Sequence, residues 1–183
     1  MVSFHVRYVP GGYRMFTRMA PKQHANTVFD IDLEKLKQAG IRGIITDLDN
    51  TLVGAKAPNA TPELVNWFAK LRAYGFSVVI VSNNGKHRVS RFSDPLGLPY
   101  IYKAKKPIRT AFRQALGMMN LQASETAVIG DQMVTDVLGG NRMGLHTILV
   151  KPIAPADEGF FTRINRRIEK AAIASLRKKG LHP

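Results

Sequence analysis

The sequence predicts an α/β fold built on a parallel sheet. Short apolar stretches alternate with segments of helical spacing along most of the chain, and this order is typical of parallel strands joined by right-handed helical crossovers. The stretches are apolar on both faces, as strands buried between helices are. Five strands are expected, near residues 44–46, 77–81, 100–102, 126–129 and 145–150.

Composition favours one folded domain with tails. The chain has 183 residues, of which 45% are apolar and none is cysteine, so it can bury a core but has no disulfide framework or thiolate metal site. No apolar run approaches the roughly 18 residues of a membrane span. The first residues do not resemble a secretory signal, and a cytoplasmic location is therefore expected.

The chain is strongly basic. It has 27 Lys and Arg residues against 13 Asp and Glu residues, which gives a formal net charge of +14. Such an excess predicts attraction to polyanions, a class that includes nucleic acid, anionic lipid surfaces and phosphorylated substrates. Charge alone does not choose among these partners.

Three regions are expected along the chain. Residues 1–29 form an arm in which aromatic residues alternate with Arg7, Arg14, Arg18 and Lys22. Residues 30–155 form the core, and residues 156–183 form a basic C-terminal helix. Arg-rich aromatic arms and basic amphipathic helices can both lie on an anionic membrane, but packing against the core is favoured for each.

Within the core, each helix has its own start and stop signals. A short helix over residues 32–39 ends at Gly40. The next is capped by Thr61, has Pro62 in its first position and ends at Gly75. Further helices are expected over residues 86–92, over 108–118, and from 132 to 137 or beyond. The last of these is expected to end at Gly139-Gly140.

Polar side chains follow the first strand directly. Asp47 and Asp49 are spaced i and i+2, so an extended backbone places them on one side, and Thr51 comes next. Neighbouring carboxylates repel unless a cation lies between them, and hard oxygen ligands favour Mg²⁺. A plain Asp-Asn turn is the alternative interpretation of this stretch.

Later strands also end in polar residues. These residues are Ser82, Asn83, Lys106 and Asp131. Because parallel strands bring their carboxyl ends to one edge of the sheet, where ligands bind, we expect these side chains close to the first pair of carboxylates. These residues also have plainer interpretations, in which Ser82 begins a turn and Asp131 caps a helix. Lys103 and Lys105 are alternatives to Lys106 as the lysine of the site.

Together these groups form a set for phosphoryl transfer through an aspartyl-phosphate. Asp47 is the expected nucleophile. Asp49 is the expected general acid and then the base for water, roles that require a raised pKa. Substrate binding is expected from Thr51, Ser82, Asn83 and Lys106. Mg²⁺ is expected to be held by Asp47, Asp131 and the backbone carbonyl of Asp49.

The same positions resemble the motifs of the haloacid dehalogenase-like phosphatases. Asp47 to Thr51 is similar to motif I (DxDxT), and Ser82 to motif II. Lys106-Pro107 is similar to the motif III lysine, and Gly130-Asp131 with Asp136 to motif IV. More narrowly, ITDLDNTLV, VSNN, AKKP and GDQMVTDVLGGNRMG resemble the YqeG-like family of subfamily IIIA, over residues 25–155.

The resemblance implies a Rossmann-like three-layer fold, Mg²⁺ dependence and phosphomonoester hydrolysis. About 30 residues separate Thr51 from Ser82 and about 25 separate Ser82 from Lys106, too few for a large cap domain beyond the expected helices. Such a site is open and admits a bulky or surface-bound phosphate.

The family's mitochondrial relatives include phosphatidylglycerophosphate phosphatases. A phosphate on an anionic lipid is therefore the preferred substrate hypothesis. Basic residues near the crevice agree with it, namely Lys86, Arg88, Arg91, Lys105 and Arg109.

Two alternatives stay open. A phosphatase of soluble sugar, nucleotide or polynucleotide phosphates would need the same site chemistry. A basic nucleic-acid-binding protein on a phosphatase-like fold would explain the net charge, although the sequence has no recognised nucleic-acid motif. The sequence does not specify the oligomeric state.

Overall fold

The computed structural model describes residues 18–154 and contains a parallel sheet of six strands. The strands are β1 (Gln23–Ala25), β2 (Gly43–Thr46), β3 (Ser77–Val81), β4 (Tyr100–Ile101), β5 (Thr126–Gly130) and β6 (His146–Val150). Their order across the sheet is β1-β6-β5-β2-β3-β4, and every pairing is parallel. The predicted α/β fold is confirmed.

The expected number of five strands was one too low. The additional strand, β1, pairs with β6 at the edge of the sheet, with Gln23 opposite Ile148. This segment, Gln-His-Ala, is too short and too polar to show the apolar pattern of a strand. β1 lies within the predicted arm, whose residues 1–17 are outside the described residues, as is the predicted C-terminal helix over 156–183.

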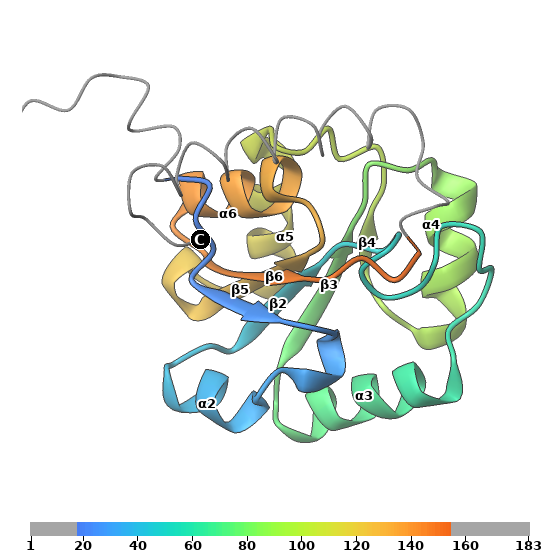
Figure 1. The fold of residues 1–183 in the computed structure, drawn as a ribbon, viewed down its shortest axis with the longest axis horizontal. Coiled ribbons are helices and arrows are strands. Elements are labelled where there is room, and N and C mark those ends of the chain that lie inside the picture. The colour runs from blue at the N-terminus through green and yellow to red at the C-terminus, as the bar shows by residue number, and fades with distance from the viewer. Residues whose placement is uncertain (1–17, 155–183) are drawn as a thin grey trace, which may run out of the picture.

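Helices cover both faces of the sheet (Figure 1). The helices are α2 (Leu33–Gln38), α3 (Pro62–Ala73), α4 (Lys86–Ser93), α5 (Arg109–Met119), the π-helix η4 (Met133–Val137) and α6 (Leu138–Met143). Single turns of 3₁₀-helix occur at η1 (Val28–Asp30), η2 (Asp94–Leu96) and η3 (Ala123–Glu125). In Figure 1, α2 and α3 lie on one side of the sheet, and α5 and α6 lie on the other. The expected three layers are therefore present.

Alternating residues of the strands fill two hydrophobic cores. Ile44 of β2 packs into a cluster with Leu64 and Phe68 of α3, whereas Ile45 packs with Phe112 of α5 on the opposite face. Both isoleucines are fully buried. This two-sided burial explains why the strands have no polar face.

The helix starts follow the sequence signals. The side chain of Thr61 accepts a hydrogen bond from the N–H of Leu64 at 3.2 Å, and Asp32 accepts one from the N–H of Lys35 at 3.0 Å. Gly75 follows α3 with a φ of +83°, a conformation that favours glycine.

The prediction that the last core helix runs out at Gly139-Gly140 was wrong, because α6 continues to Met143. Both glycines lie inside this helix. A Cβ on Gly140 would overlap Val128, and a Cβ on Gly139 would lie 2.6 Å from a ring atom of Phe112. These glycines therefore allow close packing and do not end the helix.

The two crossovers that follow β2 and β3 are too short to form a large cap over the carboxyl edge of the sheet. Between Thr51 and Ser82 the chain forms α3 and β3, and between Ser82 and Lys106 it forms α4, η2 and β4. Among residues 18–154, no helix has both the length and the apolar character that a membrane span needs.

Candidate active site

The carboxyl edge of the sheet brings the predicted residues together. Asp47 follows β2, Ser82 follows β3, Lys106 follows β4 through a short loop, and Asp131 follows β5. All four are buried. The backbone extends the strand pairing into the loops, because the N–H of Asp47 donates to the carbonyl of Ile129 at 2.9 Å. The sheet itself therefore positions these side chains.

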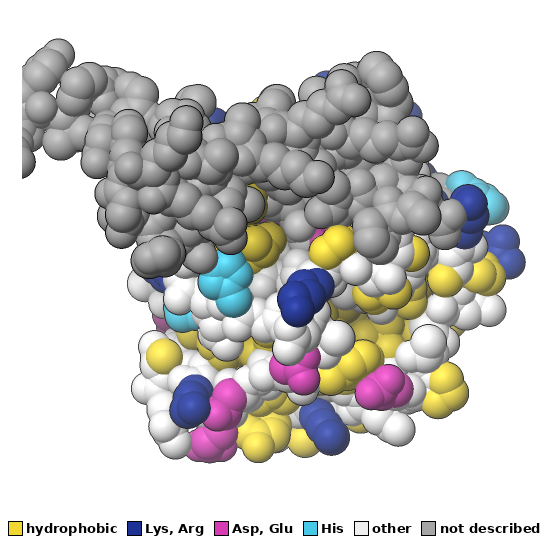
Figure 2. Space-filling view, viewed as in Figure 1, with side chains coloured by type: hydrophobic (Ala, Val, Ile, Leu, Met, Phe, Trp, Pro, Cys, Tyr) yellow, Lys and Arg dark blue, Asp and Glu magenta, His cyan; other side chains and the backbone are white. Residues whose placement is uncertain are grey.

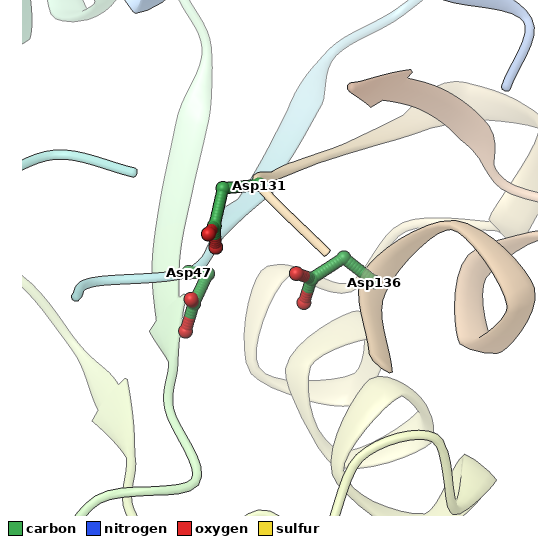
Figure 3. A group of neighbouring side chains, drawn as sticks. All are labelled: Asp47, Asp131 and Asp136. Carbon is green, nitrogen blue, oxygen red and sulfur yellow. The ribbon is translucent and has the colours of Figure 1, made fainter. Parts of the chain in front are cut away.

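Three buried carboxylates face one another at this edge. Asp47, Asp131 and Asp136 each offer an oxygen, and these oxygens lie within 4.8 Å of one another. Figure 3 shows the Asp47 and Asp131 carboxylates one above the other, with Asp136 approaching from the neighbouring helix. A buried set of carboxylate oxygens is the donor set of a hard divalent cation. These residues therefore fit a metal site, and Mg²⁺ is compatible with it.

Lys106 is the cation that the structure places in this group. Its Nζ lies 2.8 Å from Oδ1 of Asp47 and 2.7 Å from Oδ1 of Asp136. Burial by itself acts to lower the pKa of Lys106, but the carboxylates of Asp136 and Asp47 outweigh it and raise this pKa above its usual value. The ammonium therefore stays charged. Lys103 and Lys105, the two alternatives, are exposed.

Asn83 fixes the backbone around this lysine. Its Oδ1 accepts a hydrogen bond from the N–H of Lys106 at 2.7 Å, and its Nδ2 donates to the carbonyl of the same residue at 3.4 Å. The side chain of Asn83 is thus committed to holding the lysine loop. Ser82 is buried, and its Oγ accepts a hydrogen bond from the N–H of Asn84 at 3.1 Å.

Asp136 enters the site from η4. Its Oδ2 accepts hydrogen bonds from the N–H of Gln132 and the hydroxyl of Thr135, both at 3.2 Å. Burial raises the pKa of Asp136, and the ammonium of Lys106 offsets part of that shift. A Cβ at Gly130 would overlap the Asp136 carboxylate. Glycine at this position therefore makes room for the third carboxylate.

Asp49 lies beside this group with different partners. Its Oδ1 lies 2.8 Å from Nη2 and 3.0 Å from Nε of Arg88, and its Oδ2 accepts from Nδ2 of Asn84 at 3.1 Å. Burial raises the pKa of Asp49, while Asn84 and Arg88 act to lower it. A raised pKa is what Asp49 needs if it acts as a general acid.

A tight loop follows the two aspartates of this segment. Asn50 is buried with a φ of +65°, which asparagine tolerates better than most residues. Its N–H donates to the carbonyl of Val53 at 2.7 Å. The loop directs Thr51 inward, where its hydroxyl lies 3.4 Å from Oδ1 of Asp131. Thr51 therefore contacts the carboxylate group directly.

Three neighbours were not among the predicted site residues. Asp136 was recognised only as part of a motif, and a role for it required knowing that η4 turns it toward Lys106. Arg88 was identified only as a basic residue near the crevice, and Asn84 only as the last residue of the VSNN stretch. Their contacts with Asp49 join segments 35 and 39 residues apart, and sequence spacing does not reveal such contacts.

Comparisons with known proteins agree with this arrangement. Residues 103–152 match the family model described as HAD-hydrolase-like. The probable phosphatase YqeG of Bacillus subtilis (strain 168) is 52% identical over 160 residues, which cover 87% of this chain and 92% of that protein.

More distant relatives extend the comparison. The chloroplastic/mitochondrial phosphatidylglycerophosphate phosphatase 1 of Arabidopsis thaliana is 30% identical over 163 residues, which cover 84% of this chain but 47% of that protein. Among solved structures, the cobalt-bound deoxy-D-mannose-octulosonate 8-phosphate phosphatase (YrbI) from Haemophilus influenzae aligns with a TM-score of 0.52 at 18% identity, over 74% of this chain and 91% of that one. This structural likeness shows a shared fold.

Proposed function

The chain belongs to the YqeG-like family of HAD-like phosphatases, and from this premise we propose that it hydrolyses phosphomonoesters with Mg²⁺ through an aspartyl-phosphate at Asp47. One observation carries the proposal. Asp47 is buried beside the ammonium of Lys106 and within the carboxylate group that it forms with Asp131 and Asp136. Attack on a negatively charged phosphate requires positive charge beside the nucleophile. Lys106 supplies one fixed positive charge beside Asp47, and the carboxylates of Asp131 and Asp136 can bind a cation that supplies more.

In the first step, a carboxylate oxygen of Asp47 forms a bond to phosphorus as the ester oxygen leaves. Asp49 gives its proton to that leaving oxygen. Lys106, already 2.8 Å from Asp47, neutralises charge on the phosphoryl oxygens. In the second step, Asp49 accepts a proton from a water molecule, whose oxygen attacks phosphorus and frees Asp47 and inorganic phosphate.

Asp47 and Asp131, with the backbone carbonyl of Asp49, would hold the magnesium ion, and Asp136 lies close enough to contribute. The bound ion supplies Lewis acidity and charge neutralisation to the phosphoryl group. Asp136 has a second task in this proposal. Because it lies 2.7 Å from Nζ of Lys106, it orients the lysine toward Asp47.

The nucleophile assignment is tested with an isosteric variant. We expect Asp47→Asn to lower turnover of p-nitrophenyl phosphate with Mg²⁺ by about 10³-fold or more, because the amide cannot form the acyl phosphate. Asp94→Asn is the matched control, since Asp94 is exposed and lies outside the site. Equal turnover by wild type and Asp47→Asn would remove Asp47 from its role.

The substrate that we favour is phosphatidylglycerophosphate. The Arabidopsis relative bears the name of a phosphatase for this lipid, and among residues 18–154 the crossovers form no large cap that would exclude a phosphate carried on a membrane surface. Purified enzyme should prefer the lipid in mixed micelles over soluble sugar and nucleotide phosphates. Equal or better turnover of a soluble phosphate would assign that class of substrate instead.

A further inference from the structure

Three arginines line a cavity on the outer surface of α5 and α6. Arg109 and Arg113 lie in the first two turns of α5, and Arg142 lies near the end of α6. Together with Pro107 and Ile108 they line a cavity of about 350 Å³, which we call the arginine cavity. The two helices pack side by side on one face of the sheet (Figure 1).

The positive charge of the arginine cavity is not neutralised within the described part of the chain. All three arginines are exposed, and no ion pair among residues 18–154 involves them. The residues that line the cavity include no carboxylate. Guanidinium groups around one cavity repel each other, and a bound anion would remove that repulsion. Arginine is also the side chain best suited to hold phosphate through paired N–H groups.

Ile108 adds an apolar group to this charged surface. Its side chain is 55% exposed although it is large and apolar, and it lines the same cavity as the arginines. Exposed apolar side chains among basic ones are typical of surfaces that bind anionic membranes. A single-stranded nucleic acid would instead require aromatic side chains for base stacking, and the lining of the cavity has none.

We propose that the arginine cavity binds phosphate headgroups of anionic phospholipids and docks the protein on a membrane, with Ile108 entering the apolar boundary. The chain runs from Lys106 through Pro107 into this surface, so docking would bring the active-site edge close to lipid phosphates. The proposal extends the lipid version of the proposed function. Docking can nevertheless be measured without any hydrolysis, so either proposal can fail alone.

The test is vesicle flotation with the full chain. Phosphatidylcholine vesicles, with and without phosphatidylglycerol, are compared at low and high salt. We expect wild type to bind only the anionic vesicles and to lose binding as salt rises. The variant Arg109→Gln/Arg113→Gln/Arg142→Gln should bind on the order of 10- to 100-fold more weakly.

The matched control removes the same charge from the opposite face. Lys35→Gln/Lys37→Gln/Lys70→Gln alters exposed lysines of α2 and α3, a surface on which acidic and basic side chains are mixed (the lower part of Figure 2). This control should retain nearly all vesicle binding. Circular dichroism melts of both triple variants establish that the fold is intact.

Several results would overturn the proposal. Equal losses in the two triple variants would show that net charge, and not the arginine cavity, governs binding. Unchanged binding by the arginine variant, or no binding by wild type, would remove the cavity as a docking site. If the arginine variant lost binding to RNA while vesicle binding was unchanged or absent, the cavity would be a nucleic-acid site.

Discussion

At the scale of single residues, the positive charge of Lys106 reduces the repulsion among three buried carboxylates. It is the cation between Asp47 and Asp136, and its side chain is only 3% exposed. Removing one member of a buried ion pair leaves uncompensated charge. The lysine therefore has a structural task in addition to its proposed contact with substrate.

We expect Lys106→Met to affect both tasks. Turnover of p-nitrophenyl phosphate should fall about 10²- to 10³-fold because a fixed donor to the phosphoryl group is lost. In urea without Mg²⁺, the free energy of unfolding should fall by about 3–5 kcal/mol. Lys105→Met, an exposed neighbour, is the control. Wild-type values for both measurements in Lys106→Met would contradict this account.

Arg88 should control the protonation of Asp49. Burial raises the pKa of Asp49, and Arg88 opposes this rise, so Arg88→Met should raise the pKa further while retaining the apolar stem. A general acid works only while it is protonated. The alkaline limb of kcat/KM for an alkyl phosphate should therefore move to higher pH in Arg88→Met.

Arg91→Met tests whether this shift is specific. Arg91 lies on the same helix and is exposed, so its loss changes net charge equally without touching Asp49. Its pH profile should match that of wild type. A shift of the same size in both variants, or a shift of the Arg88→Met limb to lower pH, would show that Arg88 does not tune Asp49.

At the scale of elements, the sequence predicted strands and caps better than it predicted close packing. Continuous Val and Ile runs identified β2, β3 and β5, because both faces of those strands are buried. Local signals cannot distinguish a glycine that ends a helix from one that lets a helix approach a sheet. Gly140 is of the second kind, since a Cβ there would lie 2.8 Å from Cγ2 of Thr147.

Local sequence signals were also insufficient for part of the active site. The residues at the strand ends could be predicted because parallel strands share an edge, whereas Asp136 and Arg88 come from helices. Whether a helical side chain points into a site depends on the rotation of that helix against the sheet. The π-helical geometry of η4, which contains Asp136, has no signature in local sequence.

Two glycine-to-alanine changes test the packing argument. Gly140→Ala should lower the free energy of unfolding by about 1–3 kcal/mol, because overpacking outweighs the better helix propensity of alanine. Gly117→Ala is the control within α5, where a Cβ would meet nothing within 4 Å. It should raise stability by about 0.5–1 kcal/mol. Urea denaturation that gave both variants the same sign would contradict the assignment.

At the scale of the whole molecule, the carboxylate group couples metal binding to folding. Its members follow β2 and β5 or lie in η4, so the group assembles only when the sheet and that helix are in place. Carboxylates held close together destabilise the folded state by mutual repulsion unless a cation intervenes. A divalent cation that binds the folded chain alone should therefore stabilise the whole domain.

We expect Mg²⁺ to raise the thermal midpoint of the wild-type chain. At about 100 times its dissociation constant, a ligand of the folded state adds about 2.7 kcal/mol, which corresponds to roughly 5–10 °C for a chain of this size. Asp131→Asn keeps the shape of the side chain but removes its charge, so the Mg²⁺-induced shift should largely disappear. The exposed Asp94→Asn should keep the full shift. Thermal melts with Mg²⁺ and with EDTA measure the shift of each variant. An undiminished shift in Asp131→Asn would place the stabilising ion outside this carboxylate group.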